Sequence, residues 1–273
     1  MRPILATFAA VLLLVTAGVR ADPAAGTLQR LATGDDSRGW EGVGRLDLGG
    51  GAFCTGALIA HDLVLTAAHC LFDKATGTRI DTQAIEFLAG WRDGRAEAYR
   101  GIRRAAIHPD YSFRGADRLD RVAVDLALLE LDRPIRSTRI RPFATTAATR
   151  RGDRVGIVSY ARNRAEAPSL QELCSVLQRA GGVVMLSCKV DFGASGAPIF
   201  ADGVDGPVIV SVVSAKAEAR GRDVALASEL GDRLAQLRAV LAARPGGALN
   251  AGRAAALSGA TDRSATGAKF LRP

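Results

Sequence analysis

The chain has 273 residues, of which 48% are hydrophobic and 23% charged, and this apolar content excludes an intrinsically disordered protein. The formal net charge is +8, but six of these charges come from the two ends, residues 1–21 and 244–273. The body of the chain is nearly balanced and lacks the basic excess typical of nucleic-acid binding, so we expect no nucleic-acid partner.

The N-terminal segment, residues 1–21, predicts a secretory signal peptide. It has a positive start at Arg2, an apolar run from Ile4 to Val15 and small residues up to Ala21. The run is short for a membrane span and no stop-transfer pattern follows, although an uncleaved membrane anchor is the alternative. We expect cleavage after Ala21 and a secreted or periplasmic protein without stable membrane association. Residues 22–40 are polar and predict an extended lead-in.

Two series of short apolar runs, punctuated by Gly, Asp and Pro, follow the lead-in. Many short strands at short intervals predict a barrel or a sandwich of antiparallel strands. Residues 132–151, rich in Arg, Thr and Pro, predict the connection between the two series. The expected strands cover residues 42–48, 52–60, 63–67, 85–89, 99–107 and 126–131, and then 154–160, 170–178, 182–189, 198–201, 207–214 and 223–228.

The chain changes character after the last expected strand. Leucines recur at helical spacing through residues 229–243, which predicts an amphipathic helix that ends before Pro245. Residues 244–273 contain little to bury and predict a disordered basic tail.

Four cysteines in an exported chain predict two disulfides, although four cysteines allow three pairings. Spacing favours Cys54–Cys70 and Cys174–Cys188. The second pair brackets an expected hairpin, because folding the chain back about residue 181 sets Cys174 opposite Cys188.

The histidines of the chain are His61, His69 and His108. His69 ends an apolar strand, in the sequence LTAAHC, where small neighbours leave room for the imidazole. We expect His61 at a hairpin turn and His108 at a surface turn, and neither lies in a metal-binding pattern.

Ser195 lies in the sequence GASGAP, whose glycines permit a tight turn. In such a turn the N–H groups of Gly193 and Ser195 can converge and form an oxyanion hole. Asp125 begins the apolar run DLALLEL, so its partly buried carboxylate needs a hydrogen-bond donor, which an imidazole supplies. A serine nucleophile needs a base, and the base needs an orienting partner. We therefore predict a catalytic triad of His69, Asp125 and Ser195 that needs no metal or other cofactor.

Five segments together resemble the trypsin-like serine proteases of the chymotrypsin fold, and the resemblance extends over residues 40–243. It implies an all-β fold with two antiparallel six-stranded β-barrels, at residues 41–135 and 136–243, followed by the C-terminal amphipathic helix. The active site would lie in the cleft between the barrels. The segments are FCTGALI from Phe53, LTAAHC from Leu65, IHPDY from Ile107, DLALLEL from Asp125 and GASGAP from Gly193.

The resemblance also assigns roles outside the triad. It implies that the Cys54–Cys70 bridge lies beside His69, and that Ser214 belongs to an edge strand that pairs with the substrate backbone. The substrate would be a protein or peptide, and we expect a monomer.

Some positions depart from the animal members of the family. Ala194 stands where they carry an aspartate that pairs with a new N-terminus after activation, and the chain has no IVGG activation sequence. This favours the bacterial-type branch, in which signal-peptide removal suffices. Lys189 is expected at the base of the specificity pocket and Lys216 near its wall. Two lysines favour an acidic residue before the scissile bond, unless both point to solvent.

Two other functions compete with this interpretation. One is a protease-fold binding protein that has lost catalysis, against which the complete triad argues. The other is a secreted esterase on a different fold, which would have a G-x-S-x-G sequence and the order Ser, Asp, His. The chain has neither feature.

Overall fold

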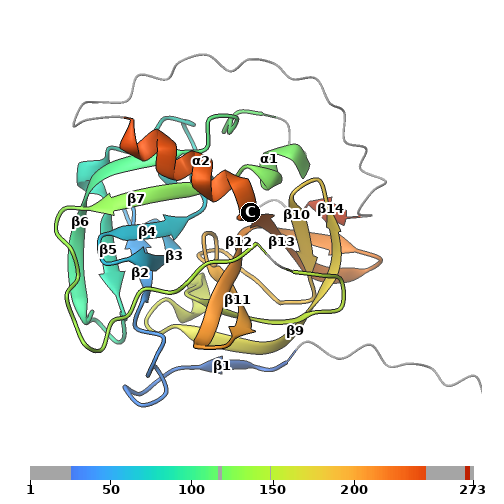
Figure 1. The fold of residues 1–273 in the computed structure, drawn as a ribbon, viewed down its shortest axis with the longest axis horizontal. Coiled ribbons are helices and arrows are strands. Elements are labelled where there is room, and N and C mark those ends of the chain that lie inside the picture. Colours follow the sequence, from blue (N-terminus) through green and yellow to red (C-terminus); the bar gives the residue numbers. More distant parts are fainter. Residues whose placement is uncertain (1–25, 116–118, 148, 244–267, 271–273) are drawn as a thin grey trace, which may run out of the picture.

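The computed structural model describes residues 26–115, 119–147, 149–243 and 268–270, so the predicted signal peptide lies outside the described residues. Two β-barrels lie side by side, one from each predicted series of strands (Figure 1). The predicted all-β fold with two barrels is therefore confirmed.

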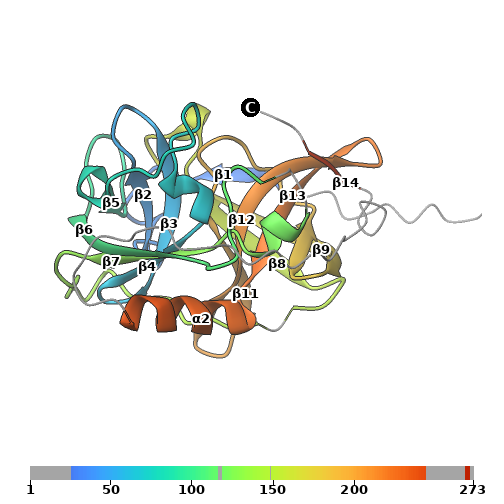
Figure 2. The same cartoon turned by 90° about the horizontal axis from the view of Figure 1, so that it is seen from above.

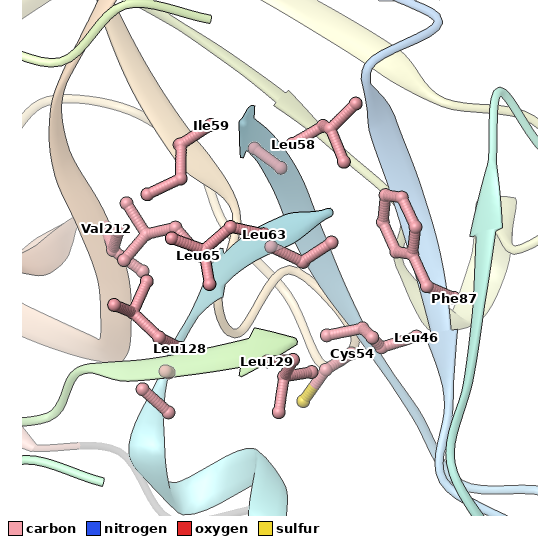
Figure 3. Close-up of a cluster of buried hydrophobic side chains, with 14 of the residues drawn as sticks. Leu46, Cys54, Leu58, Ile59, Leu63, Leu65, Phe87, Leu128, Leu129 and Val212 are labelled. Atoms are coloured by element: carbon pink, nitrogen blue, oxygen red, sulfur yellow. The ribbon is translucent and has the colours of Figure 1, made fainter. Parts of the chain in front are cut away.

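The first barrel is closed by six antiparallel strands in the order β2-β3-β4-β7-β6-β5. Apolar side chains from these strands fill its interior, among them Leu46, Leu58, Phe87 and Leu129 (Figure 3). The strands are β2 (Val43–Asp47), β3 (Phe53–Ala60), β4 (Leu63–Thr66), β5 (Glu86–Ala89), β6 (Ala98–Ile107) and β7 (Ala127–Leu131).

The second barrel has the strand order β9-β10-β13-β12-β11-β8, and the pairing of β8 with β9 closes it. Two short strands extend this sheet: β1 (Leu28–Arg30) pairs with β9, and β14 (Ala268–Phe270) pairs with β12. The barrel strands are β8 (Arg154–Ser159), β9 (Ser169–Ala180), β10 (Val183–Leu186), β11 (Pro198–Gly203), β12 (Gly206–Ala219) and β13 (Arg222–Glu229).

Within the described residues, two strands and one α-helix differ from the sequence prediction. Strand β1 lies within the expected lead-in, and helix α1 (Leu119–Ala123) was not expected. Strand β14 lies in the range predicted to be disordered, where backbone pairing with β12 orders residues 268–270. The other residues of that range, 244–267 and 271–273, lie outside the described residues.

Helix α2 (Gly231–Ala242) follows the second barrel but packs on the first, across β6 and β7 (Figure 2). Its buried residues Leu234 and Leu237 join a core that contains side chains from both barrels. The rings of Trp40 and Phe143 lie 4.9 Å and 4.8 Å from the ring of Phe200 in the same core. This continuous packing holds the barrels together and so fixes the loops at their seam.

The helices of the described residues include none long and apolar enough to cross a bilayer.

Both predicted disulfides are present, Cys54–Cys70 and Cys174–Cys188. The second depends on a detail that spacing does not reveal. The register of β9 with β10 shifts by one residue after Met185. Without this shift Cys188 would face Ser175, and with it Cys188 faces Cys174.

A buried carboxylate, which two arginines bind, makes the first barrel sensitive to acid. Glu130 of β7 accepts hydrogen bonds from Arg103 and Arg104 of β6. Burial works to raise the pKa of this carboxyl group, but the hydrogen bonds from Arg104 and Arg103 outweigh it and hold the pKa below its ordinary value. A lowered pKa stabilises the fold above the unfolded-state pKa of about 4.3, and this stabilisation is lost as pH falls through the folded-state pKa.

We therefore expect the free energy of unfolding of Glu130→Gln to fall less than that of the wild type as the pH is lowered. The measurement is the free energy of unfolding in urea at a series of pH values from about 7 down to about 3. The control is Glu86→Gln, which alters an exposed carboxylate of β5. Its free energy of unfolding should change with pH as that of the wild type does. Equal slopes for wild type and Glu130→Gln would contradict the assignment.

Candidate active site

His69 lies where the chain leaves strand β4 at the seam of the barrels. The 3₁₀ helix η1 (Ala68–Leu71) carries it, and the Cys54–Cys70 bridge ties this helix to β3. The His69 side chain is 17% exposed. The imidazole therefore stands on a backbone fixed from two sides and still reaches solvent.

Asp125 is buried and accepts three hydrogen bonds. Its Oδ1 accepts the backbone N–H of His69 at 2.8 Å, and its Oδ2 accepts the His69 Nδ1–H at 2.6 Å. The hydroxyl of Ser214 also donates to Oδ2, at 2.5 Å. These donors offset the cost of burying the carboxylate. They also hold the proton of the imidazole on Nδ1, which leaves Nε2 free to accept another.

No role was predicted from the sequence for Ser228 or Tyr111, and both interact with Asp125 or with the segment before it. Ser228 of β13 donates to the carbonyl of Val122 in α1 at 2.5 Å, which ties the second barrel to the segment before Asp125. Burial raises the pKa of Tyr111, and the nearby charge of Asp125 raises it further, so this phenol stays protonated. No local sequence pattern could have indicated the hydrogen bond of Ser228, because it joins segments that lie far apart in the chain.

Ser195 lies in the loop between β10 and β11 and is half-buried. Its carbonyl accepts the backbone N–H of Thr55 in β3 at 2.9 Å. The next residue, Gly196, packs so closely that an added Cβ would lie 2.1 Å from the hydroxyl oxygen of Thr66, at the end of β4. The loop that carries Ser195 therefore packs against strand β3 and against the end of β4, which leads to His69.

The structure thus brings His69 and Asp125 into direct contact and places the Ser195 loop beside them. Within the described residues, no hydrogen bond joins the Ser195 hydroxyl to the imidazole. Such bonds are often formed only when substrate is bound.

The backbone N–H groups of Gly193 and Ser195 have no acceptor within the described part of the chain. Their neighbours are bonded: Phe192 N–H donates to the Asp191 carboxylate at 2.8 Å, and Ala194 N–H to the Asp191 carbonyl at 2.9 Å. Two unpaired N–H groups in one turn are what a developing oxyanion requires.

The carbonyl of Phe192 fixes the direction of the Gly193 N–H. This carbonyl accepts the backbone N–H of Arg162 at 2.7 Å. The C=O and N–H of one trans peptide point in opposite directions, so the bond turns the Gly193 N–H away from Arg162. The loop thereby keeps its orientation although Ala194 is buried and carries no charge.

Gly193 cannot be replaced without disturbing this loop. Its φ is +98°, and an added Cβ would lie 2.4 Å from the ring of Phe53. Its carbonyl accepts the hydroxyl of Thr55 at 2.9 Å. Sequence reasoning found the glycine but not Thr55 or Arg162, which act on the loop through its backbone.

The residues predicted to bind substrate have different surroundings. Ser214 is in direct contact with Asp125. Lys189 is exposed, and its backbone N–H donates to the side chain of Gln171 at 2.9 Å. Lys216 is half-buried, and its ammonium group lies 3.4 Å from the carboxylate of Asp223. The acidic preference of the pocket therefore stays a prediction.

The other histidines do not join the site. His61 lies in the turn between β3 and β4, as predicted. The prediction for His108 was wrong: it is 3% exposed rather than on the surface, and burial lowers its pKa. Cys54, His69 and Cys70 have their sulfur and nitrogen atoms within 4.8 Å of one another, but both sulfurs are in the disulfide and offer no thiolate to a metal.

The Cys54–Cys70 bridge should contribute to stability as well as to the position of His69. It closes a loop with a sequence separation of 16, and such a loop corresponds to roughly 3 kcal/mol in the chain-entropy estimate. We expect Cys54→Ala/Cys70→Ala to lower the free energy of unfolding by about this amount, measured in urea. The matched control is Cys174→Ala/Cys188→Ala, which should lower stability similarly but retain more activity. Equal loss of activity in both variants, at a temperature where both are folded, would contradict a local role for the first bridge.

Comparison with known proteins identifies a matching family and similar chains. The family described as the trypsin-like peptidase domain matches residues 54–209. A modular serine protease of Drosophila melanogaster is 37% identical over 105 residues, which are 35% of this chain and 16% of that protein. The chain therefore matches only a small part of that relative's length.

Among solved structures, a Glu endopeptidase in complex with MPD is similar, with a TM-score of 0.64 and 17% sequence identity. The match covers 80% of this chain and 97% of the other chain. At this level of identity the likeness shows the fold, which is the two-barrel arrangement described above.

Proposed function

The chain belongs to the trypsin-like peptidase family, and on this premise we propose that it is a secreted serine endopeptidase with His69, Asp125 and Ser195 as its triad. The observation that carries the proposal is the buried Asp125 carboxylate bonded to both the backbone and the ring of His69. The N–H groups of Gly193 and Ser195, which have no acceptor among the described residues, support the second part of an acyl-transfer site.

The proposed reaction proceeds through an acyl-enzyme. Nε2 of His69 takes the proton of the Ser195 hydroxyl while Oγ attacks the scissile carbonyl, and the N–H groups of Gly193 and Ser195 bind the resulting oxyanion. His69 then gives the proton to the leaving amine. A water molecule, activated by His69, hydrolyses the acyl-enzyme and restores the serine. Asp125 keeps the imidazole oriented and stabilises its charged form.

A catalytically silent binding protein of the same fold is the less favoured alternative. Burying a carboxylate costs free energy, which its hydrogen-bond donors offset, and a protein that only binds has no need for one of these donors to be an imidazole. The aligned pair of His69 and Asp125 therefore supports catalysis.

We also propose that the protein belongs to the bacterial-type branch and is active once its signal peptide has been removed after Ala21. The bond from Arg162 to the Phe192 carbonyl supports this, because it orients the oxyanion loop without an activation ion pair. For specificity, we propose an acidic residue before the scissile bond, which the exposed charge of Lys189 supports, whereas the ammonium group of Lys216 already lies beside the carboxylate of Asp223. The name of the structural neighbour, Glu endopeptidase, agrees with that preference.

The test is labelling and cleavage by the mature protein. A serine-directed phosphonate should modify the freshly secreted enzyme at Ser195, and a peptide library should give cleavage with acidic residues before the scissile bond. Labelling without any cleavage would favour a different hydrolase, and a preference for Arg would refute the acidic pocket. Activity that appears only after a later cut near residue 40 would refute the proposed maturation.

A further inference from the structure

Strand β12 has two partners on the side that faces the Ser195 loop, and they leave an open edge between them. Strand β11 pairs with β12 as far as Val212, and Val213 exchanges backbone hydrogen bonds with the Ser195 loop. Strand β14 pairs with residues 217–219. Among the described residues, 214–216 have no backbone partner on this side, and we call them the open edge.

The position of β14 on this side follows from the pairing of β12. A strand can have only one neighbour on each side, and β13 pairs with β12 through residues 217–219. Strand β14 must therefore lie on the opposite side of β12, which is the side of β11 and of Ser195. Figure 2 shows β14 beside β12, at the end of the long strands of the second barrel.

A substrate strand on the open edge would run toward β14. The scissile carbonyl must lie at Ser195, beside the Ser214 end of the edge. The residues before the scissile bond then extend from Ser214 toward Lys216, which makes the substrate antiparallel to β12. Strand β14 is also antiparallel to β12. A longer substrate would need the same backbone groups of residues 217–219 that β14 occupies.

We propose that β14 is a specificity element that closes the far end of the substrate-binding edge. This inference rests on the proposed peptidase function. Peptides with about three residues before the scissile bond fit the open edge, at one residue for each residue of β12. Longer peptides gain further strand pairing only by displacing β14, so the C-terminal segment of the chain competes with them.

The test compares two peptides that share the same scissile bond and the same three preceding residues, one of which carries three more residues upstream. We expect Lys269→Pro/Phe270→Pro to raise kcat/KM for the longer peptide by up to about tenfold, the upper limit for the loss of one backbone hydrogen bond between β14 and β12. Neighbouring N–H groups of a strand point to opposite sides, so one of the two prolines removes a donor that faces β12. The matched control, Lys269→Ala/Phe270→Ala, keeps both N–H groups.

The proposal predicts no change in kcat/KM for the shorter peptide in either variant, and a gain for the longer peptide in the proline variant. The same ratio of long to short peptide in wild type and proline variant would overturn it. An equal gain in both variants would also overturn it, because that would trace the effect to the side chains. If no form of the protein cleaves the shorter peptide, the proposed function itself fails, and the two failures are thus distinguishable.

Discussion

Ser195→Ala should lower kcat by on the order of 10⁶ and leave the fold unchanged. The hydroxyl is the proposed nucleophile, and without it neither the acyl-enzyme nor the proton transfer to His69 can occur. Within the described residues the Ser195 hydroxyl makes no hydrogen bond, so its removal leaves no buried partner unsatisfied. The measurement is single-turnover and steady-state hydrolysis of a peptide, together with the urea midpoint of unfolding.

The control for this variant is Ser112→Ala, which removes an exposed serine hydroxyl and should retain full activity. Labelling by a serine-directed phosphonate should disappear with Ser195→Ala and persist with the control. Hydrolysis that survives in Ser195→Ala preparations at more than trace level would show that the nucleophile has been misassigned.

Much of the fold was predictable because local patterns determine strands. The apolar runs of both series correspond to the twelve barrel strands, and leucines at helical spacing indicated α2. The side chains of the site were predictable for a different reason. Histidine, aspartate and serine each stood in a local sequence that constrains the backbone, as the glycines around Ser195 do. The sequence could only lead us to expect that His69 and Asp125 meet, and in the structure two hydrogen bonds join them.

The features that were missed depend on distant segments. His108 was expected at the surface, but its burial is a tertiary property that its own turn does not determine. The orientation of Gly193 depends on the hydroxyl of Thr55 and the backbone N–H of Arg162. Both groups bond to backbone carbonyls of the loop, and the loop's own residue types give no signal of such bonds. Strand β14 forms on an edge more than 40 residues away in the chain. Strand pairing of this kind uses main-chain groups that every sequence has.

Asp125→Asn should lower kcat by about 10⁴ at neutral pH while the protein remains folded. In the wild type Oδ2 accepts the Nδ1–H of His69 at 2.6 Å and the hydroxyl of Ser214 at 2.5 Å. An asparagine has one oxygen acceptor, and its NH₂ group can only donate. If that group faces the imidazole, Nδ1 becomes the acceptor and the proton moves to Nε2, which then cannot take the proton of Ser195.

The comparison with Ser214→Ala separates this effect of the tautomer from a simple loss of hydrogen bonding. That variant removes one donor to the Asp125 carboxylate but keeps the carboxylate and therefore the Nδ1–H form of His69. We expect it to lose about tenfold in kcat, from one charge-assisted hydrogen bond. Imidazole NMR should show the Nε2–H form in Asp125→Asn and the Nδ1–H form in Ser214→Ala. Equal losses of kcat in the two variants, with the same tautomer of His69 in both, would contradict the proposed role of Asp125. They would mean that the residue contributes only one of several hydrogen bonds and does not set the tautomer.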